Sequence, residues 1–310
     1  MIDINKFFIL SKNIGDNYSL IQGPGGNTSY KEGSQITIKK SGAFLKDATN
    51  KEIFINEEIE LLDNFYENEK NNKKFSKEMS IETPLHIIFE EKYVFHYHSL
   101  LSIIISSCFA TKKIKNICQK LNMIWIPYKR PGVELAQEVG SKMGKNKIFF
   151  LQNHGMLIGS NSIDEISKTI DKTEKEFLNI LGISENFFAI SLKFKGLSKE
   201  GLYQYEVSNF EELSKLKIIN NKFLFPDHAV FGNYKYIEKS LVEEYRGNEM
   251  YLQNNTIFTK DKLTQSEIEI LRSVLIIINH TEEVLNYISK EVASDLITSE
   301  DEQYRINKNK

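Results

Sequence analysis

The feature that most constrains the fold is a series of short apolar runs that alternate with amphipathic helical patterns. YVFHYH (93–98), MIWIPY (123–128) and KIFFLQNHGMLIG (147–159) are rich in β-branched and aromatic residues and are bounded by turn residues, as strands are. A long amphipathic pattern over 162–182 follows them and predicts a helix. Strands and helices mixed in this way predict a layered α/β fold.

Further helices are predicted on either side of these strands. One is expected over 4–15 and another over 99–121, and a third is expected to begin near Ser80, where serine caps and Pro84 falls in the first turn. The polar, charged segment 63–79 that precedes Ser80 predicts a solvated loop or a frayed helix end, with a recruited lid as the alternative.

The pattern of predicted elements changes after about residue 190. Short strand-like runs separated by turns appear there, in KFLFPDHAVFG (222–232) and EMYLQNNTIFTKD (249–261), and helices are expected from about residue 263 to the end. We therefore expect a first domain over residues 1–188 and a smaller α+β extension over residues 189–310.

Composition narrows the classes of function. The net charge of −2 gives no reason to expect nucleic acid or an acidic membrane as a partner. No apolar stretch approaches the roughly 20 residues that span a bilayer, and the N-terminus lacks the basic start of a signal peptide. Cys108 and Cys118 have a spacing that suits neither a metal knuckle nor a redox pair. The simplest expectation is a reduced, cytoplasmic protein.

Two histidines stand two residues apart in FHYHSL (95–100), although the chain has only six. Side chains at i and i+2 leave the same face of a strand, so His96 and His98 would project side by side, as two ligands of one metal ion must. His154, between an apolar strand and a glycine, would add a third imidazole. Three imidazoles without thiolates indicate an open, catalytic metal site. The alternative is that they are half-buried histidines satisfied by their neighbours.

SIETPLH (80–86) places Glu82 at a helix start. A carboxylate there can simply complement the helix dipole, or it can act as a base or metal-proximal group facing the histidines. His86 lies four residues later on the same helix face, either as a partner of that site or as a core histidine.

Two glycine-containing turns could hold an anion. GPGGNTS (23–29) follows a strand, and its backbone N–H groups can approach a phosphate closely. It has neither the Gly-Lys-Ser/Thr of a Walker loop nor the spacing of a dinucleotide fingerprint. KKSGAF (39–44) adds a Ser-Gly turn beside two lysines, and together the two loops could cradle a phosphate.

The motifs GPGGNTS, KKSG, SIETPLH, FHYHS, IPYKRPGVELA and LQNHGMLIG follow one another in the order found in the class II aldolase/adducin family. The chain resembles that family over about residues 5–185. It is most similar to the aldolase half of proteins that fuse rhamnulose-phosphate aldolase to a short-chain dehydrogenase, and LFPDHAVF (224–231) and the terminal EDEQYR (300–305) resemble the end of that half. The resemblance implies a three-layer α/β/α fold with a central, largely antiparallel sheet. It also implies a homo-oligomer, such as a tetramer, with active sites at subunit interfaces.

The resemblance also implies roles for individual residues. Glu82 would be the acid/base, and Tyr128 would protonate the aldehyde oxygen, across an interface. The metal ligands would be His96, His98 and His154. The residues that hold the phosphate would be Gly26, Asn27, Ser41, Gly42 and Ser80.

The expected activity is that of a zinc-dependent aldolase, with another divalent metal as an alternative, cleaving or forming the C3–C4 bond of a ketose phosphate through an enediolate. An epimerase, dehydratase or decarboxylase of the same family would share the first step. A non-catalytic, adducin-like interaction protein is the alternative of another class, and the presence of all three histidines and Glu82 argues against it.

Two features depart from the small phosphate aldolases. Ile81 stands where many of them have a second serine, which weakens the inference that the substrate is phosphorylated. The C-terminal extension has no counterpart in them. Asp227 and His228 could reach the site from it, or could belong to an ordinary strand and turn.

Overall fold

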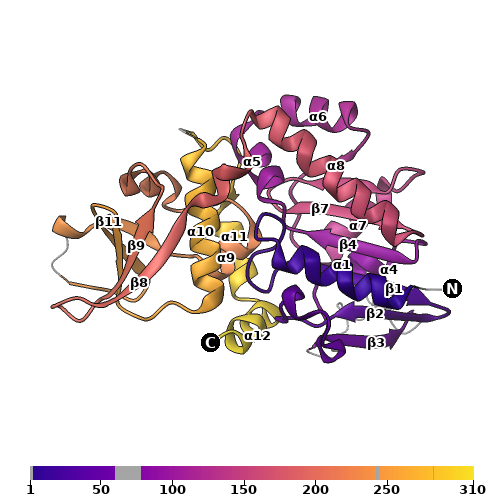
Figure 1. The fold of residues 1–310 in the computed structure, drawn as a ribbon, viewed down its shortest axis with the longest axis horizontal. Coiled ribbons are helices and arrows are strands. Elements are labelled where there is room, and N and C mark those ends of the chain that lie inside the picture. Colours follow the sequence, from indigo (N-terminus) through magenta and orange to yellow (C-terminus); the bar gives the residue numbers. More distant parts are fainter. Residues whose placement is uncertain (1–2, 60–77, 242–243, 282) are drawn as a thin grey trace.

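A computed structural model of the protein describes residues 3–59, 78–241, 244–281 and 283–310. Figure 1 shows a seven-stranded sheet at the right and a five-stranded sheet at the left, with helices between them. The charged segment 63–79, for which a loop or a frayed helix end was expected, lies outside the described residues except for its last two. Within the described ranges, every helix is too short or too polar to cross a membrane.

The seven-stranded sheet has the order β3-β2-β1-β4-β7-β6-β5. All neighbouring strands are antiparallel except β5 and β6, which are parallel, so the expected largely antiparallel sheet is confirmed. The strands are β1 (Asn27–Glu32), β2 (Gln35–Lys39), β3 (Phe54–Glu58), β4 (Tyr93–Tyr97), β5 (Ile124–Ile126), β6 (Ile148–Leu151) and β7 (Gly155–Ser160).

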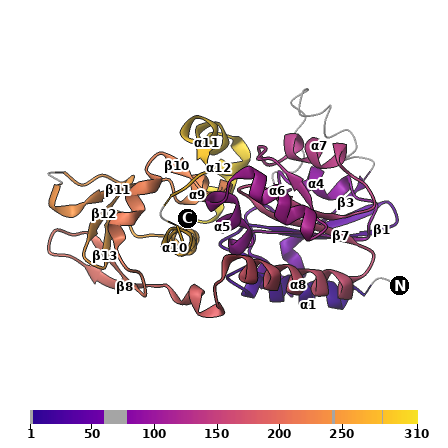
Figure 2. The same ribbon diagram turned by 90° about the horizontal axis from the view of Figure 1, so that it is seen from above.

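Helices cover both faces of this sheet, which confirms the three-layer arrangement. In Figure 2, α1 (Ile4–Asp16) and α8 (Ile163–Leu181) lie on one face, and α4 (Thr83–Ile87) and α7 (Val133–Ser141) lie on the other. Strand β4 alternates between the two layers. Its Phe95 packs in the hydrophobic cluster that contains α1 and α8, whereas its Val94 packs in the cluster that contains α4 and α7.

Local sequence explains the longest helix. The Ser162 side chain accepts a hydrogen bond from the Glu165 backbone N–H, which caps the start of α8, and acidic residues in the first turn complement the helix dipole. Gly182 ends the helix in the left-handed conformation, with φ of 66°. The buried positions recur at helical spacing, at Ile163, Ile166, Ile170, Thr173 and Phe177.

The single helix expected over 99–121 is wrong. The segment forms α5 (Leu100–Cys108) and α6 (Thr111–Lys120), separated by an extended Phe109. A distant segment binds the carbonyl groups at the end of α5: the Asn286 side chain donates to the Ser106 and Phe109 carbonyls at 2.7 Å each. Because these carbonyls are satisfied from outside, the helix need not continue.

The described residues of the C-terminal part form the second sheet and four α-helices. The sheet order is β11-β12-β13-β9-β8, and β10 (Lys222–Phe223) pairs separately with β14 (Ile288–Ser289). This α+β composition agrees with the expected extension. The remaining strands are β8 (Ser191–Leu197), β9 (Tyr203–Ser208), β11 (Lys235–Glu238), β12 (Glu249–Gln253) and β13 (Thr256–Thr259). The helices are α9 (Pro226–Phe231), α10 (Gln265–Asn279), α11 (Lys290–Ile297) and α12 (Glu300–Lys308).

The strands expected over 249–261 are confirmed as β12 and β13. The strand expected over 222–232 is wrong beyond β10, since most of this run forms α9. Pro226 occupies the first turn of that helix, where its fixed φ and missing N–H are tolerated. A short apolar run fits a strand or a helix equally well, and here the proline and the packing of α9 against α10 and α11 favour the helix.

The two sheets are joined by one continuous hydrophobic cluster, which includes Ile105 of α5 and Leu271 of α10. The end of the chain also returns to the first sheet. The Lys308 ammonium donates to the Ser41 carbonyl at 3.0 Å, and the Asn309 amide donates to the Gly42 carbonyl at 3.4 Å. The division at residues 188 and 189 falls within a 3-10 helix, Glu185–Ala189, and stays a prediction.

Candidate metal centre and substrate pocket

Strand β4 delivers two of the three candidate imidazoles. His96 lies near its end and His98 follows directly after it, and the two side chains are 0% and 3% exposed. Their rings face each other, with the two Nε2 atoms 3.1 Å apart. This is the arrangement expected from the period of two along a strand.

The turn between β6 and β7 brings His154 to the same place. Asn153 holds that turn in the left-handed region, with φ of 53°, and its amide donates to the carbonyls of Leu224 at 3.0 Å and Asn286 at 3.1 Å. Gly155 then passes so close to β4 that a Cβ atom would lie 2.3 Å from the Tyr97 carbonyl oxygen. Only glycine permits this approach, which places the His154 ring beside His98, with ring centroids 5.2 Å apart.

Glu82 completes the cluster from the start of α4. It is the residue before that helix, yet its side chain accepts no capping hydrogen bond. Instead Oε1 lies 3.3 Å from Nε2 of His96 and 3.1 Å from Nε2 of His154. One ligand atom from each of Glu82, His96, His98 and His154 lies within 4.8 Å of the others, and all four residues are buried.

The hydrogen bonds indicate where the ring protons lie. Nδ1 of His96 faces the Met156 carbonyl at 2.9 Å, which can only accept, so this nitrogen carries the proton. Nε2 of His98 accepts from the Gly26 backbone N–H at 3.4 Å, so the proton of that ring is on Nδ1. When both rings are neutral, two unprotonated Nε2 atoms face each other at 3.1 Å. These lone pairs and the adjacent carboxylate fit a divalent cation.

The charges of the cluster also suit a cation. Burial would raise the pKa of Glu82, but the adjacent His96 and His154 hold it well below its usual value, so Glu82 is ionised. Burial lowers the pKa of His154 to about 4 although Glu82 opposes this, so that ring is neutral near pH 7. A carboxylate and neutral imidazoles are the forms in which these groups bind metals.

His86 is connected to this cluster through Asn27. Its Nδ1 contacts the Ser29 hydroxyl at 2.8 Å, and its Nε2 contacts the Asn27 amide oxygen. The amide nitrogen of Asn27 in turn donates to Oε2 of Glu82 at 2.8 Å. His86 is thus both buried in the core and placed to orient Asn27 against the candidate base.

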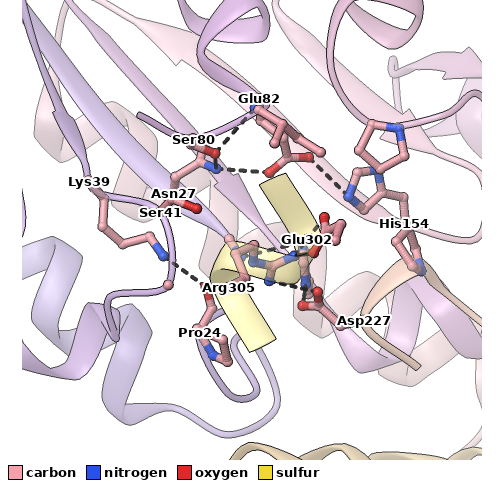
Figure 3. A pocket seen from close by; sticks show the side chains of 16 residues that line it. Pro24, Asn27, Lys39, Ser41, Ser80, Glu82, His154, Asp227, Glu302 and Arg305 are labelled. Atoms are coloured by element: carbon pink, nitrogen blue, oxygen red, sulfur yellow. Dashed lines mark hydrogen bonds and ion pairs between the residues drawn. The ribbon is translucent and has the colours of Figure 1, made fainter. Parts of the chain in front are cut away.

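A narrow pocket of about 30 Å³ opens beside the cluster, enough for about two water molecules (Figure 3). Its wall includes Glu82, His98 and His154, together with all five residues predicted to hold a phosphate. Those five are Gly26, Asn27, Ser41, Gly42 and Ser80. Gly26 and Gly42 adopt positive φ values of 58° and 71°, which other residues rarely adopt.

Two predicted site residues are absent from the pocket wall: His96, which belongs to the cluster beside it, and Tyr128, which lies in neither. Tyr128 is half-buried, and its hydroxyl has no hydrogen-bond partner among the described residues. Burial raises the pKa of Tyr128 well above its usual value, so the hydroxyl keeps its proton. The nearby Pro131 does line the pocket.

The pocket also contains charged residues that sequence reasoning did not assign. Lys39 is 2% exposed and donates to the carbonyls of Pro24 and Ala43 at 2.8 and 2.7 Å (Figure 3). Burial, together with the positive charge of Arg305, lowers the pKa of Lys39 to about 7. The KKSG motif was noticed for its glycine turn, but nothing in it showed that this lysine points inward.

Three further charged residues come from the C-terminal part: Asp227, Glu302 and Arg305 all line the pocket. Asp227 is one of the two residues that the sequence suggests could reach the site. His228 instead lies 1% exposed in the core, where Nδ1 accepts from the Leu224 backbone N–H at 3.1 Å. The EDEQYR stretch was recognised only as part of the resemblance, and its alternating charges fit an ordinary solvated helix equally well.

The model of the class II aldolase and adducin N-terminal domain matches residues 10–177 of the chain. The protein belongs to this family. Membership, together with a buried Glu/His cluster that could hold a metal ion, indicates an enzyme of the aldolase type. A relationship to proteins fused to a dehydrogenase remains a prediction.

Several solved structures are similar to the chain. The N-terminal class II aldolase domain of a conserved protein from Thermoplasma acidophilum has 24% identity and a TM-score of 0.46, covering 54% of this chain and 88% of that one. L-fuculose-1-phosphate aldolase from Thermus thermophilus has 15% identity and a TM-score of 0.45, covering 57% and 91%. An aldolase II superfamily protein from Pseudomonas syringae has 12% identity and a TM-score of 0.41, covering 57% and 75%. No curated protein matches the chain.

Proposed function

We propose that the protein is a metal-dependent aldolase, with zinc as the metal, that cleaves or forms the C3–C4 bond of a ketose phosphate. The observation that carries this proposal is the convergence of Oε1 of Glu82 with the three histidines at a pocket lined by glycine-rich turns. Donors of this kind and number suit zinc at a catalytic site, although other divalent ions accept the same ligands.

His96, His98 and His154 would hold the cation. When bound, it would supply Lewis-acid polarisation of the substrate carbonyl. Met156 keeps the proton of His96 on Nδ1, which leaves Nε2 available. Burial lowers the pKa values of His98 and His154, so these two rings need no proton loss at neutral pH before they bind. Burial also acts to lower the pKa of His96, but Glu82 raises it above its usual value, so Nε2 of His96 would give up a proton when the cation binds.

Glu82 would act as the base. In the aldol direction its carboxylate takes the proton from C3 of the donor ketone phosphate, and the electron pair of that C–H bond forms the enediolate. Asn27 donates to Oε2 at 2.8 Å, which fixes the orientation of the carboxylate and leaves Oε1 facing the cluster. In the cleavage direction Glu82 returns the proton to C3 after the C3–C4 bond has broken.

The turns around Gly26 and Gly42, with Ser41, Ser80 and Asn27, would hold the phosphate. Positive φ values at the two glycines suit turns whose backbone approaches an anion closely, while the Gly26 N–H itself points at His98. The buried Lys39, whose pKa burial lowers to about 7, adds positive charge to the same wall when it is protonated. Tyr128, which lies away from the pocket of its own chain, would protonate the aldehyde oxygen in the site of a neighbouring subunit. We therefore also propose a homo-oligomer, and a cytoplasmic setting in keeping with two free cysteines.

The test follows only removal of the C3 proton from the donor, so the aldehyde need not be known. Metal-loaded protein is incubated with dihydroxyacetone phosphate in D2O, and loss of the C3 proton signal is followed by NMR with and without a chelator. Exchange that the chelator abolishes supports the proposal. No exchange from metal-loaded protein would contradict the aldolase assignment and direct screening to intact ketoses and sugar acids, as an epimerase, dehydratase or decarboxylase would use.

A further inference from the structure

The candidate metal cluster contacts a set of buried charged residues from the C-terminal part of the chain, drawn in Figure 3. Oδ2 of Asp227, in α9, lies 3.2 Å from Nδ1 of His98. Oδ1 of the same carboxylate accepts from the Arg305 guanidinium at 2.8 Å. Arg305 also donates to both oxygens of Glu302, at 3.0 and 2.8 Å. A chain of charged contacts therefore runs from α12 through Asp227 to a candidate metal ligand.

The His98–Asp227 contact has a defined direction. Because the Gly26 N–H donates to Nε2 of His98, the ring proton lies on Nδ1, which faces Oδ2 of Asp227. Neither Nδ1 of His98 nor Oδ2 of Asp227 has a hydrogen-bond partner elsewhere in the part of the chain that the structure describes. Each of these two buried atoms can therefore be satisfied by the other, through the proton between them.

The glycine at position 25 leaves room for the contact between His98 and Asp227. A Cβ atom on Gly25 would lie 2.6 Å from Oδ2 of Asp227 and 2.7 Å from Nδ1 of His98. Real Cβ contacts are longer than this, so a side chain at Gly25 would push the carboxylate and the imidazole apart. The glycine-rich turn thus serves the metal side of the pocket as well as the predicted anion side.

Stability alone is a poor explanation for these charges. Asp227 and Glu302 are each 1% exposed, and buried ion networks rarely stabilise a fold more than apolar residues of the same volume. A carboxylate that accepts the distal N–H of a metal-binding histidine has a known physical effect. It fixes the tautomer and the ring orientation and makes the ligating nitrogen more basic.

We propose that Asp227, held by Arg305 and Glu302, is a positioning residue that orients His98 for metal binding. The C-terminal part of the chain thereby completes the metal centre. This inference rests on the metal site of the proposed function, but it does not depend on which reaction follows.

The test is an Asp227→Asn variant. Asparagine keeps the shape but has one acceptor oxygen, so it can accept from Arg305 or from His98 but not from both, as the two oxygens of Asp227 do. Zinc affinity is measured by competition with a chromophoric chelator, and the Co²⁺-substituted protein gives an absorption spectrum that reports the number of ligands. Glu249→Gln is the matched control, because Glu249 is a buried carboxylate of the same region that accepts a hydrogen bond from Tyr251 at 2.8 Å.

The expected result is a loss of about 10- to 100-fold in zinc affinity for Asp227→Asn. The cobalt band intensity should stay that of the wild type, and Glu249→Gln should bind zinc normally. Wild-type affinity in Asp227→Asn would overturn the inference. A changed cobalt ligand number would also overturn it, because Asp227 would then be a ligand itself.

Arg305→Lys provides a second variant in case Asp227→Asn does not fold. Lysine keeps the charge but lacks the planar fork that bonds Glu302 and Asp227 together, so a smaller loss of zinc affinity is expected. Unchanged affinity would exclude Arg305 from the role. Wild-type protein that binds no metal would overturn both the proposed function and this inference. Metal-binding wild type with an equally tight Asp227→Asn would overturn the inference alone.

Discussion

The N-terminal and C-terminal parts of the molecule contribute to one pocket in different ways. The N-terminal part supplies Glu82 and three histidines, whose ligand atoms converge within 4.8 Å. The C-terminal part supplies Asp227, Glu302 and Arg305, of which Asp227 contacts His98 of the cluster. We infer that the first part determines which chemistry is possible and that the second adjusts how well it is carried out. Substitutions in the two parts should then differ in kind as well as in size.

The largest effect is expected for His96→Ala in the N-terminal part. This change removes an imidazole that is 0% exposed and leaves a gap among the four buried groups that could hold the metal. Metal content after dialysis should fall from stoichiometric to near zero, and proton exchange should disappear with it. His280→Ala is the control, since His280 is half-buried against Phe187, with ring centroids 5.2 Å apart. Stoichiometric metal in folded His96→Ala protein would refute the ligand assignment.

Glu82→Gln should separate chemistry from metal binding. The amide cannot take a proton from carbon, so exchange of the donor should fall about 10²- to 10⁴-fold, whereas the three histidines should still hold metal. Proton exchange by NMR and metal content on the same sample decide this. If exchange survived largely intact, Glu82 would not be the base.

A second carboxyl group provides the matched control for this experiment. Glu174 accepts from the Ser99 hydroxyl at 2.9 Å, and burial raises the pKa of Glu174 to about 8. At pH 7 it is therefore mostly protonated, and glutamine resembles that neutral form. Glu174→Gln should leave both exchange and metal content unchanged.

The contrast between the two parts also explains which site residues could be predicted from the sequence. His96 and His98 are two residues apart in a strand, and strand geometry alone places them on one face. Glu82 and His154 come from segments with helix-start and turn residues that are visible locally. The structure brings these four together, and their roles remain predictions that the variants above would test.

Sequence reasoning reached less of the C-terminal part because the decisive contacts are long-range. Arg305 and Lys308 are both basic residues near the end of α12, and only packing shows that Arg305 meets Asp227, 78 positions away. The break between α5 and α6 has a similar origin, since Asn286 binds the Ser106 carbonyl from 180 positions away. Local periodicity contains no information about such partners.

The smallest effect is expected for Lys308→Met, which tests whether the C-terminal part also supports the predicted anion side of the pocket. The Lys308 ammonium donates to the Ser41 carbonyl at 3.0 Å, and its aliphatic stem lies so close to Gly42 that a Cβ there would be 3.0 Å from Cδ of the lysine. Methionine keeps the stem and removes the hydrogen bond, worth about 1 kcal/mol or roughly fivefold in affinity.

Lys308→Met should therefore raise KM for a phosphorylated donor about fivefold while kcat and metal content stay unchanged, because the loop would be held less firmly and the cluster would not be touched. Steady-state exchange kinetics measure KM and kcat. Lys195→Met is the control, because Lys195 pairs with Glu206 at 3.1 Å on the exposed β8–β9 hairpin. A fall in kcat with no change in KM would mean that α12 acts on the metal centre alone. The N-terminal part alone would then form the anion side of the pocket, and the C-terminal part would act on the site through His98.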